Sequence, residues 1–295
     1  MKLTVCVSIL LFFAGVPLLS GCFWKKQTYG RTSPAIHKAA DFVLSDSNSG
    51  LWQDARAGIN RQTVYVLKTS EVPDEVCDLV VQGLERVIRE TGRTIEVARE
   101  ESGDLPGYQA PEWYQNEAMT DREYLHGRQA NAGKIVELLR SHDTSHDHFI
   151  VLITGSDLTS GEEGNNFIYG LSSYPYIIVS AKRFLDWKQI GKDGYSGEIY
   201  DEAVSLVAAH EFGHYLDLVQ RNFNSWTNTG TLLDQHCKGE NGDCLMQQSN
   251  VDAPGCHTAL EQAQLIFNRE NWLCPDCRLE VEYRKEALVD AGLAW

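Results

Sequence analysis

The sequence predicts an α+β fold, in which helices cover a mixed sheet and a small irregular or helical part follows at the C-terminal end. Three features of the chain lead to this class. Strand-like apolar runs alternate with helix-like periods between residues 63 and 179, an order that builds a sheet with covering helices. Residues 149–153 are continuously apolar, as in a strand from the interior of a sheet. Everything beyond residue 199 has a helical or irregular pattern.

The first elements of this order begin at residue 63. Residues 63–67 are rich in β-branched and aromatic side chains, which is typical of a strand. Pro, Asp and Glu at residues 73–75 open a helix, because proline and acidic side chains favour a first turn. Its apolar side chains recur at steps of three and four as far as Ile88, which makes one buried face. Residues 94–97 are expected to form a second strand.

The following stretch is less regular. Residues 100–127 contain proline, glycine and aromatic side chains without a clear period, so we expect one long loop. Residues 130–139 then predict a helix, and the apolar run described above follows it. Residues 167–169 and 176–179 resemble two further strands.

The charge of the chain limits its partners. The 295 residues include 41 Asp and Glu against 26 Lys and Arg, for a net charge of −15 at pH 7. Such a surface repels phosphate backbones, so we expect no binding to nucleic acid. It also has no electrostatic attraction to anionic lipid, so attachment to a membrane requires another device.

The N-terminal residues are such a device. Lys2 precedes an apolar run over residues 3–19, and small residues follow it, as in a secretory signal. The sequence Leu-Ser-Gly-Cys at residues 19–22 resembles the lipobox of bacterial lipoproteins, which implies a lipid on Cys22. The protein would then lie in the bacterial cell envelope, anchored to a membrane and exposed on its non-cytoplasmic side. A plain membrane-anchor helix is the alternative.

This interpretation divides the chain into three parts. Residues 1–21 are the signal peptide, and residues 22–60 are a polar tether that separates the folded domain from the membrane. Residues 61–295 form the domain that carries the chemistry described next.

A metal-binding pattern lies in a run that favours helix. His210-Glu211-Phe212-Gly213-His214 follows residues 199–209, which are rich in Ala, Val and Leu. Residues four apart share a helix face, so His210 and His214 can bind one zinc ion. Glu211 is about 100° around the helix, where it can take a proton from a water that zinc has acidified. This arrangement is typical of metal-assisted peptide hydrolysis.

Residues further along complete a longer pattern. His236-Cys237, Cys244-Leu245-Met246 and Cys274-Pro275-Asp276-Cys277 follow the HExxH motif in order. With that motif they resemble the archaemetzincin family of zinc metallopeptidases, over roughly residues 63–277. The resemblance implies a metzincin-like fold and a peptide or protein substrate.

The resemblance also implies a role for each of these residues and two zinc ions per chain. His210, His214 and His236 would bind a catalytic zinc, with Glu211 as general base. Met246 would be the residue of the Met-turn beneath that metal. A second, structural zinc would be bound by four thiolates, those of Cys237, Cys244, Cys274 and Cys277. Two disulfides among these four cysteines are the alternative that export favours.

The sequence departs from the family around the third ligand. Asp217 replaces the family's glycine, and His236 comes 16 residues later than the usual third histidine. We therefore expect the helix to continue through Leu218 and to end near Asn222 or Asn224. Besides His236, the third ligand could be Asp217, which lies seven residues from His210 and on the same face, or His257.

Three smaller features of the sequence each have two interpretations. Cys77 and Cys256 are either a disulfide or two buried thiols. His142, His146 and His148 are expected in a solvated loop, with a surface metal site as the alternative. The whole chain could also be a non-catalytic, zinc-stabilised lipoprotein that binds a partner. Glu211 argues against that last reading, because a scaffold does not require a carboxylate beside the metal.

Overall fold

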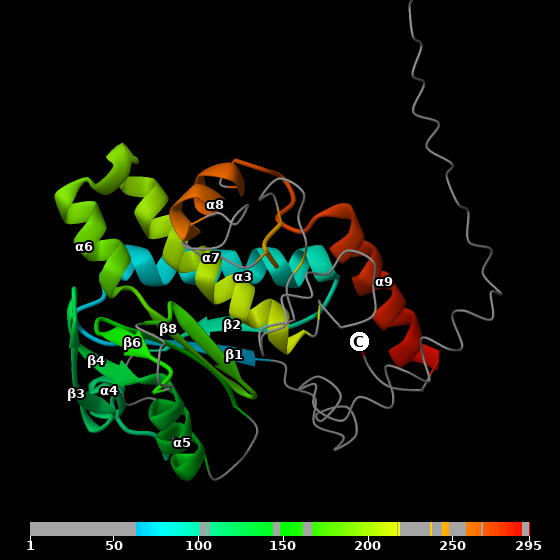
Figure 1. Ribbon diagram of the computed structural model, residues 1–295. Coiled ribbons are helices and arrows are strands. Elements are labelled where there is room, and N and C mark those ends of the chain that lie inside the picture. Colours follow the sequence, from blue (N-terminus) through cyan, green and yellow to red (C-terminus); the bar gives the residue numbers. More distant parts are fainter. Residues whose placement is uncertain are drawn as a thin grey trace, which may run out of the picture. The chain divides into compact units, whose positions relative to one another are not determined.

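The main sheet of the computed structural model contains five strands in the order β2-β1-β5-β8-β7 (Figure 1). Its strands are β1 (Thr63–Lys68), β2 (Glu96–Arg99), β5 (Phe149–Thr154), β7 (Gly170–Ser173) and β8 (Tyr176–Ser180). β2, β1, β5 and β8 are parallel to one another, whereas β7 is antiparallel to β8. The structure describes residues 63–100, 105, 107–143, 148–161, 167–216, 218, 237, 244–247, 258–266, 268–290 and 295.

Burial of both faces explains the composition of the two central strands. Every residue of β5 and of β8 is buried, which accounts for their continuous apolar runs. Alternate side chains enter two separate cores on the opposite faces of the sheet. The mixed sheet of the predicted α+β class is therefore confirmed, and its strands 63–67, 149–153 and 176–179 are each extended by one residue.

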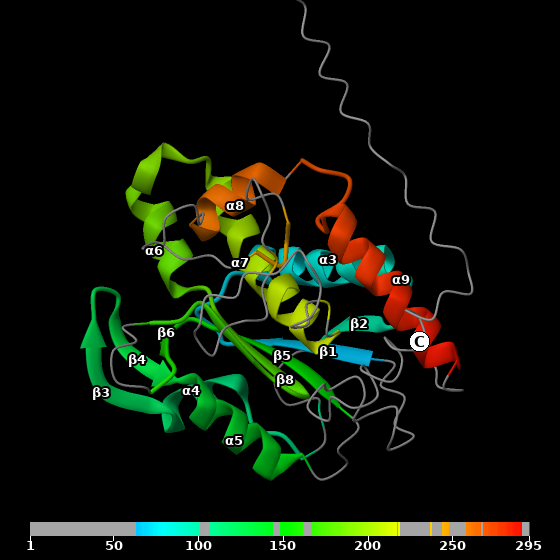
Figure 2. The same cartoon turned by 45° about the vertical axis from the view of Figure 1, so that its right-hand side comes forward.

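Helices cover both faces of this sheet (Figures 1 and 2). α3 (Asp74–Thr91) and α7 (Gly197–Tyr215) lie on one face and share the larger core with Val66, Val151 and Val179. α4 (Pro111–Glu117) and α5 (Ala132–His142) lie on the other face, where they share a smaller core with β5 and β8.

A glycine permits the close approach of the two helices on the larger core. A Cβ atom at Gly83 of α3 would overlap the Ser205 hydroxyl of α7. That hydroxyl donates to the Leu79 carbonyl at 2.8 Å, so the contact is also a hydrogen bond. α7 is buried on almost every side from Ile199 to Ala209, as expected of a helix that is apolar all round.

The predicted long loop over residues 100–127 is wrong. This stretch contains α4 and then β3 (Met119–Tyr124), which pairs with β4 (Gly127–Asn131). With β6 (Asp157–Thr159) these strands form a second sheet of order β3-β4-β6. α4 has only seven residues, too few to display a helical period. β3 is largely polar because much of it faces solvent, so its sequence shows no apolar alternation.

Other boundaries differ by a few residues. The helix predicted at 130–139 begins at Ala132, because β4 continues to Asn131, whose side chain caps the helix by accepting from the Lys134 N–H. The strand predicted at 167–169 begins later, at Gly170, as β7. Within 167–169, Ile168 forms an isolated β-bridge with Leu158. β2 begins two residues later than predicted.

The C-terminal part is helical or irregular, as predicted. It contains α8 (Ala259–Ile266), which packs on α7, and α9 (Pro275–Asp290), which begins beside the end of α3 (Figure 2). Described residues outside these helices include Cys237 and the turn at residues 244–247. The backbone of Cys237 forms an isolated parallel β-bridge with Gln247 of this turn. Within the described ranges, no helix is both long enough and apolar enough to span a membrane.

A buried carboxylic acid lies on α7, in the layer that faces α3. Glu202 is 6% exposed, and burial raises its pKa to about 7, against the opposing effect of the nearby Arg86 guanidinium. In the unfolded chain the pKa returns to about 4.3. The contribution of Glu202 to the free energy of unfolding is therefore fully present below about pH 4.3, and it is lost as the pH rises through 7.

We expect Glu202→Gln to remove this loss of stability. The gain in unfolding free energy over the wild type should be about 2 kcal/mol larger at pH 8 than at pH 5. Urea unfolding at both pH values measures it, with Glu198→Gln, an exposed carboxylate of the same helix, as the matched control. A gain that is the same at both pH values would contradict the assignment.

Candidate metal centre

The two histidines of the HExxH motif converge at the C-terminal end of α7. Because they are four residues apart, His210 and His214 share one face, and their Nε2 atoms lie 3.1 Å from each other. Two imidazole nitrogens bound to one tetrahedral zinc at 2.0–2.1 Å would be about 3.3 Å apart. The donor atoms and their spacing therefore fit a zinc ion.

The other nitrogen of His210 has a backbone partner. Its Nδ1 donates to the Leu245 carbonyl at 2.7 Å, which leaves Nε2 as the nitrogen that faces His214. A carbonyl in this position fixes the tautomer and the orientation of a metal-binding imidazole. Leu245 is fully buried between Cys244 and Met246, so the C-terminal part of the chain orients this histidine.

Glu211 is oriented from the opposite direction, by the main sheet. The backbone N–H of Ser172 in β7 donates to its carboxylate, while burial raises its pKa to about 8. The Ser180 N–H donates to the Tyr169 carbonyl at 2.8 Å, and hydrogen bonds alternate along an antiparallel pair. The N–H groups of Gly170 and Ser172 therefore point away from β8, along the edge that faces Glu211.

Gly170 leaves the space that Glu211 occupies. A Cβ atom at this position would lie 2.9 Å from Cγ and 3.0 Å from Oε1 of Glu211. The same atom would lie 3.0 Å from Cγ1 of Val207, one turn earlier on α7. A residue with any side chain at this point of β7 would therefore displace the carboxylate.

Met246 packs directly beneath the HExxH segment. It is fully buried, and a Cβ atom at Gly213 would overlap its sulfur atom. Gly213 is three residues after His210, and residues three apart are neighbours on a helix, so the methionine supports the helix beside the face from which the histidines project. The Met246 carbonyl in turn accepts from the Cys237 N–H at 2.7 Å.

α7 ends earlier than the sequence predicts. The helix ends at Tyr215, so the prediction that it continues through Leu218 to Asn222 or Asn224 is wrong. The Leu218 N–H bonds back to the Gly213 carbonyl at 3.1 Å, and its side chain is buried against Gly213. Such an apolar contact over the last turn is common where a helix terminates.

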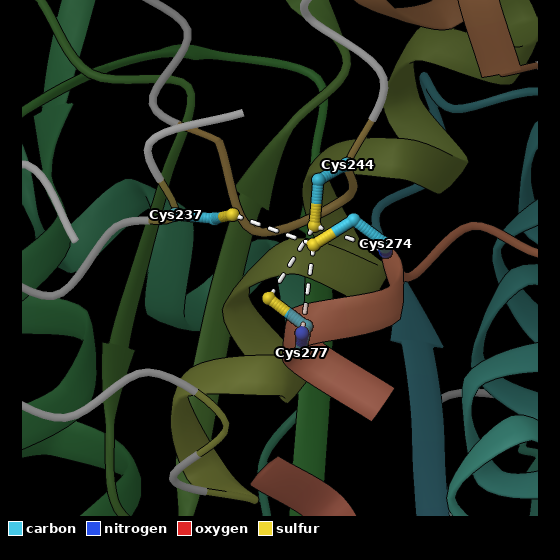
Figure 3. A group of neighbouring side chains, drawn as sticks. All are labelled: Cys237, Cys244, Cys274 and Cys277. Atoms are coloured by element: carbon cyan, nitrogen blue, oxygen red, sulfur yellow. Dashed lines mark hydrogen bonds between the residues drawn. The ribbon is translucent and has the colours of Figure 1, made fainter. Parts of the chain in front are cut away.

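Four cysteines form a second group, shown in Figure 3. The Sγ atoms of Cys237, Cys244, Cys274 and Cys277 all lie within 4.8 Å of one another, and together they could hold a metal ion. Cys244 and Cys277 are 3.5 Å apart and Cys237 and Cys274 are 3.6 Å apart, far longer than a disulfide of about 2.05 Å, and all four are free cysteines. Four sulfurs around one zinc would be about 3.8 Å apart.

The surroundings of these cysteines suit a metal held by thiolates. Cys274 is partly exposed and the other three are buried. A hydrogen bond from Cys237 holds the pKa of Cys274 well below its usual range, which favours the thiolate form of that residue. The Cys274 N–H also points at the sulfur of Cys244. The predicted alternative of two disulfides does not match these four free thiols.

Several predicted residues lie outside the described part of the chain. These are His236, its alternatives Asp217 and His257, the lipidation residue Cys22, and Cys256. The assignment of His236 as third ligand therefore stays a prediction. Cys77 is a buried free thiol, and burial raises its pKa.

The histidines before β5 do not form a metal site among the described residues. His142 belongs to α5, and its Nδ1 donates to the Leu138 carbonyl at 2.9 Å. His148 lies 3.9 Å from the buried Asp143 carboxylate. Both are partly buried, so the predicted solvated loop is wrong for these two, while His146 lies outside the described residues.

Sequence reasoning did not single out Gly170, Ser172 or Leu245. Ser172 and Leu245 act through backbone atoms, which any side chain could accompany. Gly170 did leave a signal, because an isolated glycine near a strand marks a close approach of another group.

No protein-family model and no curated protein matches the chain. The crystal structure of archaemetzincin from Methanopyrus kandleri is similar, at 21% identity and a TM-score of 0.48, over 77% of this chain and 96% of that one. A zinc-dependent peptidase from Methanocorpusculum labreanum (strain Z) is similar at 19% and 0.46, over 74% of this chain and 99% of that one.

We expect Gly170→Ala to destabilise the fold by about 1–3 kcal/mol, because the new methyl group overpacks against Glu211. In a Glu211→Ala background the cost should fall by about 0.5 kcal/mol or more, since the crowded atoms are gone. Urea unfolding of the four proteins of this cycle measures the coupling.

Gly197→Ala is the matched control for this cycle. A Cβ atom at Gly197 would meet only Lys188 Cε, at 3.4 Å. Additive effects of Gly170→Ala and Glu211→Ala would show that β7 does not constrain the carboxylate.

Proposed function

We propose that this protein is a zinc-dependent peptidase that hydrolyses peptide bonds with Glu211 as general base. The observation that carries the proposal is a pair of imidazoles whose Nε2 atoms are 3.1 Å apart, with the buried Glu211 carboxylate on the residue that follows the first of them in α7. Such a combination fits acid–base chemistry at a metal, whereas a purely structural site has no use for the carboxylate.

His210 and His214 would hold the catalytic zinc, with His236 as the proposed third ligand. When bound, zinc supplies a Lewis acid that acidifies water and polarises the carbonyl of the scissile bond. The four cysteines would hold a second zinc, which closes the C-terminal part and offers no position for water. We thus propose two zinc ions per chain, of which the first is labile and the second tight.

The chain itself would supply proton transfer and orientation. Glu211 takes a proton from the attacking water and returns it to the amine that leaves, which splits the peptide into an acid and an amine. The Ser172 N–H holds one side of its carboxylate, which restricts the direction in which the proton is taken. Met246 supports the helix below, so the paired histidines keep their separation.

The edge of the main sheet offers a place for the substrate. β7 is the last described strand of that sheet, and Gly170 and Ser172 turn their backbone groups away from β8. The Ser172 N–H is bonded to Glu211, so a substrate would bond to the other backbone groups of this edge. An extended peptide can add to such an edge through main-chain hydrogen bonds. A peptide or protein segment lying along β7 would bring a backbone carbonyl to the paired histidines.

We also propose that the protein is exported and anchored by lipid on Cys22, in the cell envelope and outside the cytoplasm. The support is the apolar run at residues 3–19 and the small residues that precede Cys22. The tether at residues 22–60 would leave the catalytic domain free to meet its substrates.

Glu211→Gln should keep both zinc ions and lower kcat/KM by about a hundredfold to ten-thousandfold, because the amide cannot accept the proton. Hydrolysis of a fluorescently labelled unfolded protein and elemental analysis for zinc measure the two quantities. Glu198→Gln, on the same helix but exposed, is the control.

Activity that survives Glu211→Gln would refute the proposed general base. A wild-type protein that holds two zinc ions and hydrolyses nothing would favour the non-catalytic lipoprotein that binds a partner.

Cys22 should carry lipid and be the first residue of the mature chain. One acyl chain binds a membrane only marginally, so at least two are expected. Mass spectrometry of the membrane fraction measures the modification, and Cys22→Ser should release the protein or block its processing. A mature chain that begins at another, unmodified residue would reject the anchor.

A further inference from the structure

A buried carboxylate joins α3 to the segment that enters the cysteine group. Glu90 accepts the N–H of Trp272 at 2.8 Å and the N–H of Leu273 at 3.0 Å, one on each carboxylate oxygen. Its side chain is 6% exposed, and Arg86 Nε lies 3.6 Å from the first oxygen. Hydrogen bonds to a charged group in such a setting are roughly twice as strong as those between neutral groups.

The residue that Glu90 holds is itself tightly seated. The Trp272 side chain is 1% exposed, with the Arg86 guanidinium 4.4 Å above its ring. A Cβ atom at Gly83, two turns before Glu90, would be in van der Waals contact with this ring at 3.4 Å. One face of α3 thus forms the seat for Trp272, two residues before Cys274.

From Trp272 the hydrogen bonds continue to the paired histidines. The Trp272 carbonyl accepts the Leu245 N–H at 2.7 Å, and the Leu245 carbonyl accepts from His210 Nδ1 at 2.7 Å. Each link joins segments far apart in the sequence, and each is made by a buried backbone group. The position of Glu90 is therefore transmitted to the ring of His210 in three steps.

We propose that Glu90 is a positioning residue for His210, acting through the backbone of Trp272 and Leu245. The inference rests on the proposed function for the identity of the metal, but not for its test. Because the Glu90 carboxylate holds two consecutive N–H groups, it fixes the position of the Trp272 carbonyl. That carbonyl accepts the Leu245 N–H and so fixes the position of the Leu245 backbone. The Leu245 carbonyl then fixes the angle at which His210 presents Nε2.

A second support limits how far Leu245 can move. Gln262 of α8 donates from Nε2 to the Cys244 carbonyl at 2.7 Å and lies 3.4 Å from the Leu245 carbonyl. The turn is therefore held from two sides, by α3 through Glu90 and by α8 through Gln262. Removal of one support should tilt the His210 ring and not release it.

The test is Glu90→Gln, which preserves size but sets an NH2 group against one of the two backbone N–H donors. Zinc affinity is measured by competition with a chromophoric chelator, and cobalt substitution reports ligand geometry by its visible spectrum. We expect the labile zinc to bind about tenfold more weakly, the lower end of the cost of losing a direct partner. The tight zinc should bind as in the wild type, and the cobalt spectrum of the labile site should shift.

Two controls separate positioning from general damage. Glu85→Gln makes the same chemical change at an exposed position of α3. Trp272→Phe removes part of the packing and leaves every backbone hydrogen bond, so it should lower stability without changing the affinity for the labile zinc. If Glu90→Gln does not fold, Glu90→Asp keeps the charge at a longer distance and should weaken the labile site in the same direction.

Wild-type affinity at both sites in Glu90→Gln would overturn the proposal, as would a parallel loss of both zinc ions. A wild-type protein without peptidase activity would reject the proposed function alone. Because the affinity and the cobalt spectrum do not depend on catalysis, the role of Glu90 would still be decided.

Discussion

The candidate metal centre depends on one contact, the packing of the turn at residues 244–247 beneath α7. Through its carbonyl, Leu245 orients His210, and through its side chain, Met246 fills the space below Gly213. Neither group works alone. The methionine fixes the height of the helix over the turn, and at that height the carbonyl is within 2.7 Å of the imidazole. A helix that carries HExxH is not a metal site until this turn lies against it.

The turn at residues 244–247 is held in place because residues in it and bonded to it belong to the cysteine group. Cys244 belongs to the cysteine group, and the Met246 carbonyl bonds to Cys237 of the same group. Metal at the four thiolates would therefore hold the turn through Cys244 and Cys237, since metal binding supplies folding free energy to such small segments. The close packing of α3 on α7 at Gly83 and Ser205 fixes the distance between these two helices.

The sequence predicts the parts of this structure that depend on side-chain type and local spacing. The apolar runs of β1, β5 and β8 and the helix under HExxH follow from such patterns, whereas the grouping of the four cysteines is implied by the resemblance to the archaemetzincins. The sequence does not predict β3 or α4, because one is largely solvated and the other is too short to show a period. It also does not predict where α7 ends, because a buried contact of Leu218 with Gly213, five residues earlier, decides that.

The same division explains which residues of the site can be predicted from the sequence. His210, Glu211 and His214 are named by their chemistry, but their orientation comes from backbone groups of Leu245 and Ser172. One of these lies in the C-terminal part and the other in the edge strand of the sheet. The base and the ligand are thus oriented by two different parts of the structure, both of which contact α7. A change in the cysteine group should alter the histidine without moving Glu211, and a change in β7 should do the reverse, so ligand geometry and base geometry can vary independently in this fold.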